Sequence, residues 1–207
     1  MNIKGILFDL DGVLLDTEGA YRDFWDDIDR QFSTGVSGFA DVIKGSNLTT
    51  ILNTYFRAED HAAITALLDR NQAGMDYPFF PGAVEALEKI KASGLPMALV
   101  TSSDSRKMAA VNRQHPAFTG YFNIIVTGDM VSRPKPDPEC FVTAAGLLGL
   151  DIAECLVVED SPNGLQAGMA GGATVAGLPT TVAPDVVRPL CHHLLPDISH
   201  LPALLNL

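Results

Sequence analysis

The sequence predicts an α/β fold, a doubly wound parallel sheet with an inserted helical domain. Short, continuous apolar runs recur along the 207 residues, and such runs are typical of strands buried on both faces. Segments with helical periodicity separate most of these runs, which indicates parallel strands joined by right-handed helical crossovers. The predicted strands are Ile6 to Phe8, Met97 to Val100, Ile124 to Val126, Leu156 to Val158 and Thr174 to Ala176.

Three crossover helices have recognisable ends. The clearest runs from Pro81 to Gly94, with a proline near its start, a glycine at its end and an apolar stripe between them. Asp137-Pro138 and Ser161-Pro162 are each typical of an N-cap followed by proline in the first helical position, so we expect helices there. The segment from Thr180 to Leu207 contains several prolines that limit helix length, and its sequence is the least informative part of the chain.

One stretch breaks the alternation and is predicted to be a helical insertion. It spans residues 15–79, which leaves residues 1–14 and 80–207 for the α/β core. Apolar residues from Tyr21 to Phe32, and again from Leu48 to Phe56, recur at helical spacing. Packing alone requires such spacing, so we interpret both stripes as the core of a small bundle and not as an aromatic substrate box.

The composition limits the partners. Hydrophobic residues make up 47% of the chain, enough to bury a sizeable core. The formal charge of -11, with Lys and Arg scattered singly, argues against nucleic acid or an anionic membrane as partner. Three cysteines without CxxC spacing indicate reduced thiols, and no apolar run resembles a signal peptide or a membrane span. We therefore expect a cytoplasmic protein, whose oligomeric state the sequence does not indicate.

Two carboxylates stand at the end of the first predicted strand. Asp9 and Asp11 lie two residues apart, so an extended backbone would point both to one face. Ligands of open α/β sheets bind beyond the carboxyl ends of the strands, where such a pair could share a cation or divide nucleophilic and proton-transfer duties. Calcium-binding loops also begin with an Asp-x-Asp-Gly run, but they have a Glu at the twelfth loop position. Counted from Asp9, that position in this chain is Ala20.

Two further polar groups follow predicted strands and suit an anion. Thr101 and Ser102 offer hydroxyl and backbone N–H groups that can hold phosphate oxygens, although the same residues alone would make a helix cap. Lys135 stands in a proline-rich loop. Such a stiff loop would lose little conformational entropy when the Lys135 ammonium binds an anion. The alternative for Lys135 is an exposed lysine on a turn.

Glu159 and Asp160 form a second acidic group, after the strand that ends at Val158. Adjacent carboxylates without a nearby cation in the sequence are costly unless an ion holds them. Together with Asp9 they suit Mg2+, a hard cation that prefers oxygen ligands. Asp160 could also cap the following helix, but a capping role would leave Glu159 unexplained.

The run Asp9-Leu10-Asp11-Gly12-Val13, followed in order by the Thr-Ser, Lys-Pro and Glu-Asp groups, resembles the signature of the haloacid dehalogenase superfamily of phosphohydrolases and phosphomutases. The resemblance covers the whole predicted core and, more loosely, the insertion, which is similar to the helical cap that closes over the superfamily's active site. True dehalogenases need neither a second Asp nor an acidic metal motif. The resemblance therefore implies a phosphoryl-transfer enzyme.

The resemblance also implies a role for each group. Asp9 would be the nucleophile that forms an aspartyl-phosphate, and Asp11, supported by Thr17, would protonate the leaving oxygen and then activate water. The phosphoryl group would be held by Thr101 and Ser102. Its charge would be neutralised by Lys135, which we prefer over Arg133. The Mg2+ ligands would be Asp9, the Asp11 carbonyl, Asp160 and, through the ion's shell, Glu159.

The capped subgroup that this chain most resembles includes beta-phosphoglucomutase and small-sugar phosphatases. The mutase uses a cap-loop His and a cap Arg that grips a second phosphate, whereas here Tyr21 stands near the His position and the Lys44-Gly45 turn lacks the Arg. Eleven acidic and five basic residues between Asp16 and Asp76 give this segment a charge of -6, which disfavours a bisphosphate. Lys44 or Arg70 could still supply one substrate contact.

We therefore predict a Mg2+-dependent phosphatase acting on a small phosphorylated metabolite, with a sugar phosphate favoured. A phosphomutase similar to beta-phosphoglucomutase is the alternative. A non-catalytic, receiver-like domain that binds Mg2+ is less favoured, because it would need neither Asp11 nor a cap.

Overall fold

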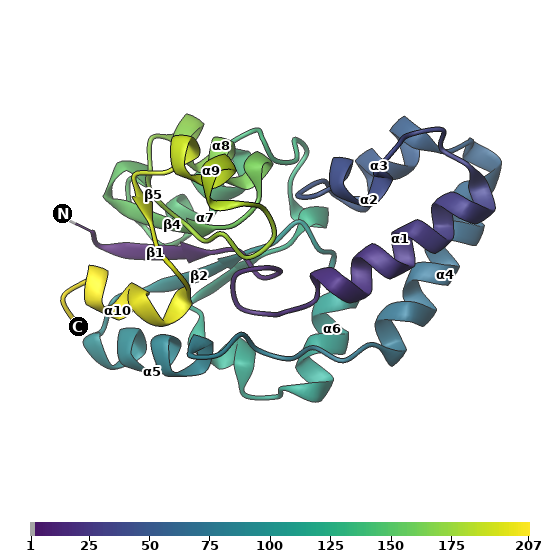
Figure 1. The fold of residues 1–207 in the computed structure, drawn as a ribbon. Helices are drawn as coiled ribbons and strands as arrows, with labels where there is room; N and C mark the ends of the chain where they lie inside the picture. The colour runs from purple at the N-terminus through teal and green to yellow at the C-terminus, as the bar shows by residue number, and fades with distance from the viewer. Residues whose placement is uncertain (1–2) are drawn as a thin grey trace.

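A six-stranded parallel sheet forms the centre of the protein in the computed structural model, which describes residues 3–207 (Figure 1). The strand order is β3-β2-β1-β4-β5-β6, so the chain winds outward from β1 in both directions. This order confirms the predicted doubly wound sheet, and the five predicted strands match within one residue at each end. The strands are β1 (Gly5–Phe8), β2 (Met97–Val100), β3 (Ile124–Val126), β4 (Cys155–Glu159), β5 (Thr174–Gly177) and β6 (His193–Leu194).

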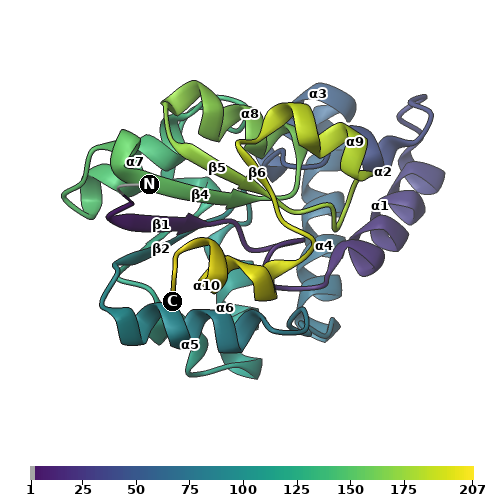
Figure 2. The ribbon, with the colours of Figure 1, turned by 60° about the vertical axis from the view of Figure 1, so that its left-hand side comes forward.

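Helices cover both faces of the sheet, because side chains alternate between faces along each buried strand (Figure 2). Ile6 and Phe8 of β1 belong to one buried cluster and Leu7 to the other. The first cluster is covered by α5 (Ala83–Ser93), α6 (Ser105–Gln114) and α10 (Leu201–Leu204). The second is covered by α7 (Glu139–Leu147), α8 (Pro162–Gly171) and α9 (Pro184–Val187).

The predicted helix starts were right for α8 and one residue early for α7. The Ser161 hydroxyl accepts a hydrogen bond from the backbone N–H of Gly164, as an N-cap should. Before α7, the Asp137 carboxylate accepts from the N–H of Glu139, and Pro138 takes the N-cap position. The short strand β6 was not predicted.

Four helices between β1 and α5 lie together beyond the carboxyl end of the sheet (Figure 1). Their buried residues form a third cluster, so both predicted stripes are bundle core. Leu15 and Phe79 pair in an isolated antiparallel bridge, which supports our proposal that residues 15–79 form a cap on a core of residues 1–14 and 80–207. The cap helices are α1 (Glu18–Phe32), α2 (Phe39–Val42), α3 (Leu48–Tyr55) and α4 (His61–Gly74).

Within residues 3–207, no helix is both long enough and apolar enough to cross a membrane.

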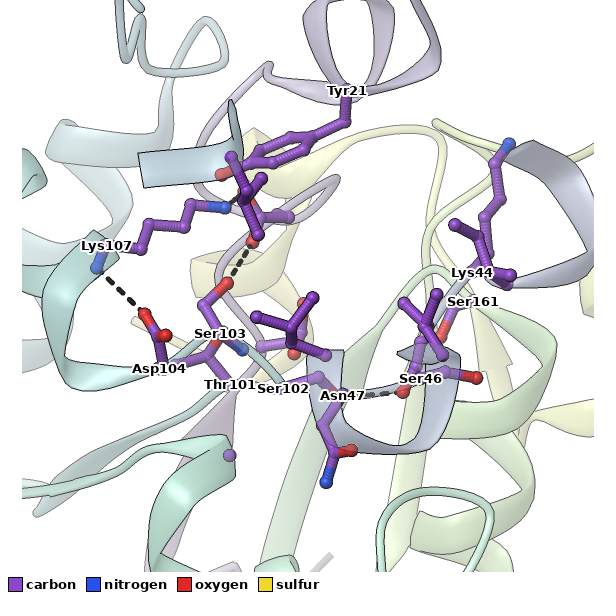
Figure 3. A pocket seen from close by; sticks show the side chains of 18 of the residues that line it. Tyr21, Lys44, Ser46, Asn47, Thr101, Ser102, Ser103, Asp104, Lys107 and Ser161 are labelled. Carbon is purple, nitrogen blue, oxygen red and sulfur yellow. Dashed lines mark hydrogen bonds and ion pairs between the residues drawn. The ribbon is translucent and has the colours of Figure 1, made fainter. Parts of the chain in front are cut away.

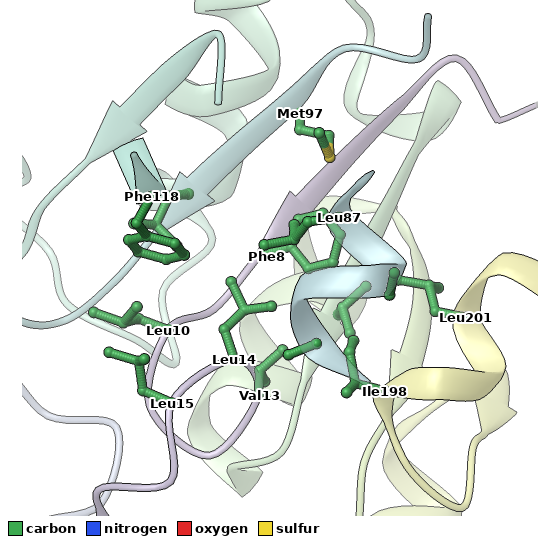
Figure 4. Close-up of a cluster of buried hydrophobic side chains, with 14 of the residues drawn as sticks. Phe8, Leu10, Val13, Leu14, Leu15, Leu87, Met97, Phe118, Ile198 and Leu201 are labelled. Atoms are coloured by element: carbon green, nitrogen blue, oxygen red, sulfur yellow. The ribbon is translucent and has the colours of Figure 1, made fainter. Parts of the chain in front are cut away.

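Helix α5 anchors one face of the core, and its Leu87 is fully buried in the same cluster as Phe8 and Leu201 (Figure 4). We expect Leu87→Ala to lower the free energy of unfolding by about 2–5 kcal/mol, since it leaves a cavity in close-packed surroundings. Lys89→Ala, at an exposed position of the same helix, should change it by less than about 0.5 kcal/mol. Urea denaturation measures both, and equal effects would contradict the assignment of the buried face.

Candidate active site

A cavity of about 410 Å³ lies between the carboxyl ends of the strands and the cap. Its lining brings together residues that are far apart in the sequence, including Asp9, Asp11, Lys44, Thr101, Ser102, Glu159 and Asp160. The other two predicted site residues contact this lining: Lys135 donates to Asp9, and Thr17 donates to Asp11. All nine predicted residues therefore meet at one place.

The Lys135 ammonium is the buried centre of this arrangement. Its Nζ lies 2.6 Å from Asp9 Oδ1 and 2.7 Å from Glu159 Oε1, and its side chain is only 2% exposed. It also donates to the Val100 carbonyl. Burial alone would lower the pKa of Lys135, but the carboxylates of Asp9 and Glu159 outweigh burial and raise it. Arg133, in contrast, is exposed and pairs with Glu139, outside the cavity lining.

Of the three buried carboxylates at this place, Asp9 and Glu159 pair with Lys135 and Asp160 does not, so one ammonium leaves negative charge uncompensated. Burial, together with repulsion from Glu159 and Asp11, raises the pKa of Asp9 to about 7 despite the opposing effect of Lys135. Burial and repulsion from Glu159 also raise the pKa of Asp160 well above its usual range. Carboxylate oxygens of Asp9, Glu159 and Asp160 lie within 4.8 Å of one another, close enough to hold one metal ion.

Asp160 and Glu159 differ in how many of their carboxylate oxygens have a hydrogen-bond partner within the protein. Among the described residues, Asp160 Oδ1 is buried without a hydrogen-bond partner, whereas Oδ2 accepts from the Thr181 hydroxyl. Glu159 Oε2 accepts from the backbone N–H groups of Asp160 and Ser161, while Oε1 accepts from Lys135. A Cβ on Gly164 would lie only 1.7 Å from Glu159 Oε1, so this turn closes tightly on the carboxylate. The free oxygen of Asp160 is the better ligand for a cation.

Asp11 is held by three donors. Its carboxylate accepts from the Thr17 hydroxyl at 2.5 Å, the Ser103 hydroxyl at 3.0 Å and the Lys107 ammonium at 2.5 Å. Burial would raise the pKa of Asp11, but the charge and hydrogen bond of Lys107, with the hydroxyl donors, lower it overall. The Thr17 contact is the one expected from the sequence.

Lys107 is the residue that sequence reasoning missed. Its side chain is 2% exposed, and its ammonium lies 4.2 Å from the centre of the Tyr21 ring of the cap, beside which Figure 3 shows it. A signal was present, because Arg106 and Lys107 both lie in the first turn of α6. Cations are unfavourable at this end of the helix dipole, and a carboxylate partner offsets that effect.

The loop that follows α2 in the cap, with Lys44 and Gly45, is hydrogen-bonded directly to the core. Ser102 donates its hydroxyl hydrogen bond to the Gly45 carbonyl at 2.8 Å, and the Asn163 amide donates to the Lys44 carbonyl at 2.9 Å. The Lys44 ammonium donates to the carbonyl of Thr181, and it also pairs with two carboxylates of the cap. Figure 3 shows Lys44 and Tyr21 on separate elements around the pocket. Ser102 and Lys44 thus already have partners within the protein.

Comparisons with known proteins find relatives that match most of the chain. A family model of haloacid dehalogenase-like hydrolases matches residues 3–172. Hexitol phosphatase A of Escherichia coli is 33% identical over 84% of this chain and 82% of its own. A phosphorylated carbohydrates phosphatase of Thermotoga maritima is 28% identical over 82% of each chain. A Bacteroides vulgatus structure, provisionally assigned as a beta-phosphoglucomutase, is 29% identical with a TM-score of 0.86, over 99% of this chain and 88% of its own.

The buried pair of Lys107 and Asp11 should contribute to stability. We expect Lys107→Met to lower the free energy of unfolding by about 2–3 kcal/mol, below the usual cost of breaking a buried pair because the Asp11 side chain is 21% exposed. In an Asp11→Asn background the same change should cost at least 1 kcal/mol less, on the order of known coupling energies. Arg113→Met, at an exposed position of α6, is the control. Urea denaturation of the four-variant cycle measures the coupling, and an equal cost in both backgrounds would exclude it.

Proposed function

The chain belongs to the haloacid dehalogenase-like hydrolases and is a phosphatase, and from this premise we propose that it hydrolyses a monophosphate ester of a small metabolite through an aspartyl-phosphate on Asp9. The observation that carries this proposal is the pairing of Asp9 with the buried Lys135 beside Asp11, at the carboxyl end of β1. The ammonium fixes the Asp9 carboxylate at the cavity and offsets repulsion between it and an approaching phosphate.

The proposed reaction has two steps. The Asp9 carboxylate attacks phosphorus, the bond from phosphorus to the ester oxygen breaks, and the leaving oxygen takes a proton from Asp11. Asp11 must therefore carry a proton when the substrate binds, although in the present arrangement Lys107 outweighs burial and lowers its pKa. Asp11 then takes a proton from water, whose oxygen attacks phosphorus and releases inorganic phosphate from Asp9. Thr101 and Ser102 hold the phosphoryl oxygens, which requires the Ser102 hydroxyl to leave the Gly45 carbonyl.

The residues present fit a divalent cation. The unpartnered Oδ1 of Asp160 and the raised pKa values of Asp9 and Asp160 are the features that a bound cation would relieve. We propose Mg2+ held by Asp9, Asp160 and the Asp11 carbonyl, with Glu159 acting through the ion's shell and through Lys135. When bound, Mg2+ would neutralise part of the charge on the phosphoryl oxygens.

A sugar phosphate is the favoured substrate, since one relative is named as a hexitol phosphatase and another as a phosphatase of phosphorylated carbohydrates. We propose Lys44 as a substrate contact once it exchanges one of its present partners.

The first experiment is phosphate release from a panel of sugar phosphates and other small phosphate esters, with Mg2+ and with a chelator. We expect Mg2+-dependent release from the wild type. Asp9→Asn, which keeps the shape but removes the nucleophile, should lower kcat by at least about 1,000-fold, on the order of losses seen for catalytic nucleophiles. Conversion of beta-glucose 1-phosphate to glucose 6-phosphate without release of phosphate would instead establish a mutase.

Removing one proposed metal ligand should change the Mg2+ requirement. Asp160→Asn is expected to raise the Mg2+ concentration for half-maximal activity by about tenfold or more, because the amide carries no charge. Asp129→Asn, which also lines the cavity but lies outside the acidic cluster, is the control. A Mg2+ titration of both variants measures the shift. Identical titration curves for wild type and Asp160→Asn would contradict the proposed site.

A further inference from the structure

The carboxylate of Asp160 is oriented by a residue from the loop that follows β5. Its Oδ2 accepts a hydrogen bond from the Thr181 hydroxyl at 2.5 Å, whereas its Oδ1 is buried without a partner among the described residues. The torsion angle that sets the plane of an aspartate carboxylate has only broad minima, so an outside partner decides that plane. The Thr181 hydroxyl therefore determines which oxygen of Asp160 is engaged and which one stays free for a cation.

The segment that carries Thr181, residues 178–183, is packed closely against the loop after β1. We call this segment the β5 loop. The Thr180 hydroxyl donates a hydrogen bond to the Gly12 carbonyl. Gly12 has a φ of 78°, and a Cβ there would lie 2.7 Å from Thr181 Cγ2 and 2.2 Å from Asp160 Oδ2. This close approach keeps the Thr181 side chain beside Asp160.

The backbone of Thr181 binds the cap at the same time. Its carbonyl accepts a hydrogen bond from the Lys44 ammonium at 3.2 Å, and the Lys44 side chain is only 10% exposed. The same ammonium lies 3.3 Å from Glu18 and 3.1 Å from Asp41, both of which belong to the cap. Thr181 thus contacts a proposed metal ligand through its hydroxyl and a charged group of the cap through its carbonyl.

The cap loop is closely fitted to the core at this place. The Asn163 amide donates to the Lys44 carbonyl at 2.9 Å, and a Cβ on Gly45 would lie 3.1 Å from both Asn163 Cβ and the Ser161 hydroxyl oxygen. Figure 3 shows Lys44 and Ser161 on neighbouring elements. A displacement of the cap loop would therefore withdraw Lys44 from the Thr181 carbonyl.

We propose that Thr181 is a positioning residue, which orients Asp160 for the cation and connects this ligand to the cap through Lys44. The inference rests on the proposed function, because it requires the Mg2+ site. Within residues 3–207 the cavity lining does not include Thr181, so Thr181 acts through Asp160 and not on the substrate. Partners that orient a metal ligand raise the affinity for the metal. Cation affinity is then higher with the cap loop in place, and by linkage a bound cation favours that position of the cap loop.

The first test measures the Kd for Mg2+ by isothermal titration calorimetry of the substrate-free protein. Thr181→Val keeps the shape but removes the hydroxyl, and it should raise the Kd by about tenfold or more. Thr181→Ser restores the hydroxyl and should bind Mg2+ as the wild type does. Urea denaturation without Mg2+ checks that each variant is folded. If the valine variant does not fold, Thr181→Ala provides the same comparison.

Thr119→Val is the matched control. Thr119 is also a half-buried threonine, but its hydroxyl donates to the Asn112 side chain, and within the described chain it lies outside the cavity lining. Its Kd for Mg2+ should equal the wild-type value. A wild-type Kd in the variants that lack the Thr181 hydroxyl, or an equal loss in Thr119→Val, would overturn the inference.

A second test asks whether the cap acts through Thr181. Lys44→Met removes the contact with the Thr181 carbonyl and also removes a positive charge. The loss of charge alone favours Mg2+ binding, and it does so equally with Thr181 or with valine at that position. Lys44→Met should therefore increase the Kd by a factor about fivefold larger in the wild-type background than in Thr181→Val. Equal factors in the two backgrounds would overturn the connection to the cap.

These outcomes are distinct from failure of the proposed function. A wild-type protein that binds no Mg2+ would contradict the proposed metal site and this inference together. A wild type that binds Mg2+, but does so independently of the Thr181 hydroxyl, would overturn the inference alone. Phosphate release from the ester panel tests the phosphatase activity separately.

Discussion

The active-site region depends on one buried ammonium. Lys135 reaches Asp9, 126 residues earlier in the chain, and Glu159, 24 residues later, and it binds both with its side chain almost fully enclosed. Two carboxylates from neighbouring strand ends could not stay charged in this environment without it. The lysine thus joins the ends of β1 and β4 to the loop after β3. The positions of Asp11, which follows Asp9, and of Asp160, which follows Glu159, depend on the same contact.

The cap is joined to the core by polar contacts that involve residues of the site. Lys107 contacts Asp11 and Tyr21 together, and Ser102 donates to the cap loop through the Gly45 carbonyl. A phosphate that takes the Ser102 hydroxyl would release one of these contacts, while the contact between Lys107 and Tyr21 would remain. In the proposed reaction, substrate binding and the position of the cap would therefore be linked through the Ser102 hydroxyl, as in a lid that responds to its ligand.

The sequence was sufficient to predict the strands and to single out nine residues that lie together at the carboxyl edge of the sheet, because both have local signals. Apolar runs mark buried strands, and polar residues directly after them mark the edge where ligands bind. Strand β6 has only two residues, and its pairing with β5 defines it more than its composition does. Lys107 carried only the weak signal of a cation in the first turn of a helix, and its partner lies 96 residues earlier. Long-range contacts of this kind have no periodicity from which to predict them.

Glu159 and Asp160 show what the structure adds to a correct motif. In the sequence they are two adjacent carboxylates with the same apparent purpose. In the fold, Glu159 ends β4 and turns its oxygens to Lys135 and to the backbone of the following turn, whereas Asp160 keeps one oxygen without a partner. A carboxylate with both oxygens satisfied by the protein gains little from binding a cation directly, but an unpartnered one gains much. The two carboxylates therefore differ in role: Glu159 holds the lysine and the turn, whereas Asp160 is the residue that we propose as the direct ligand of the ion.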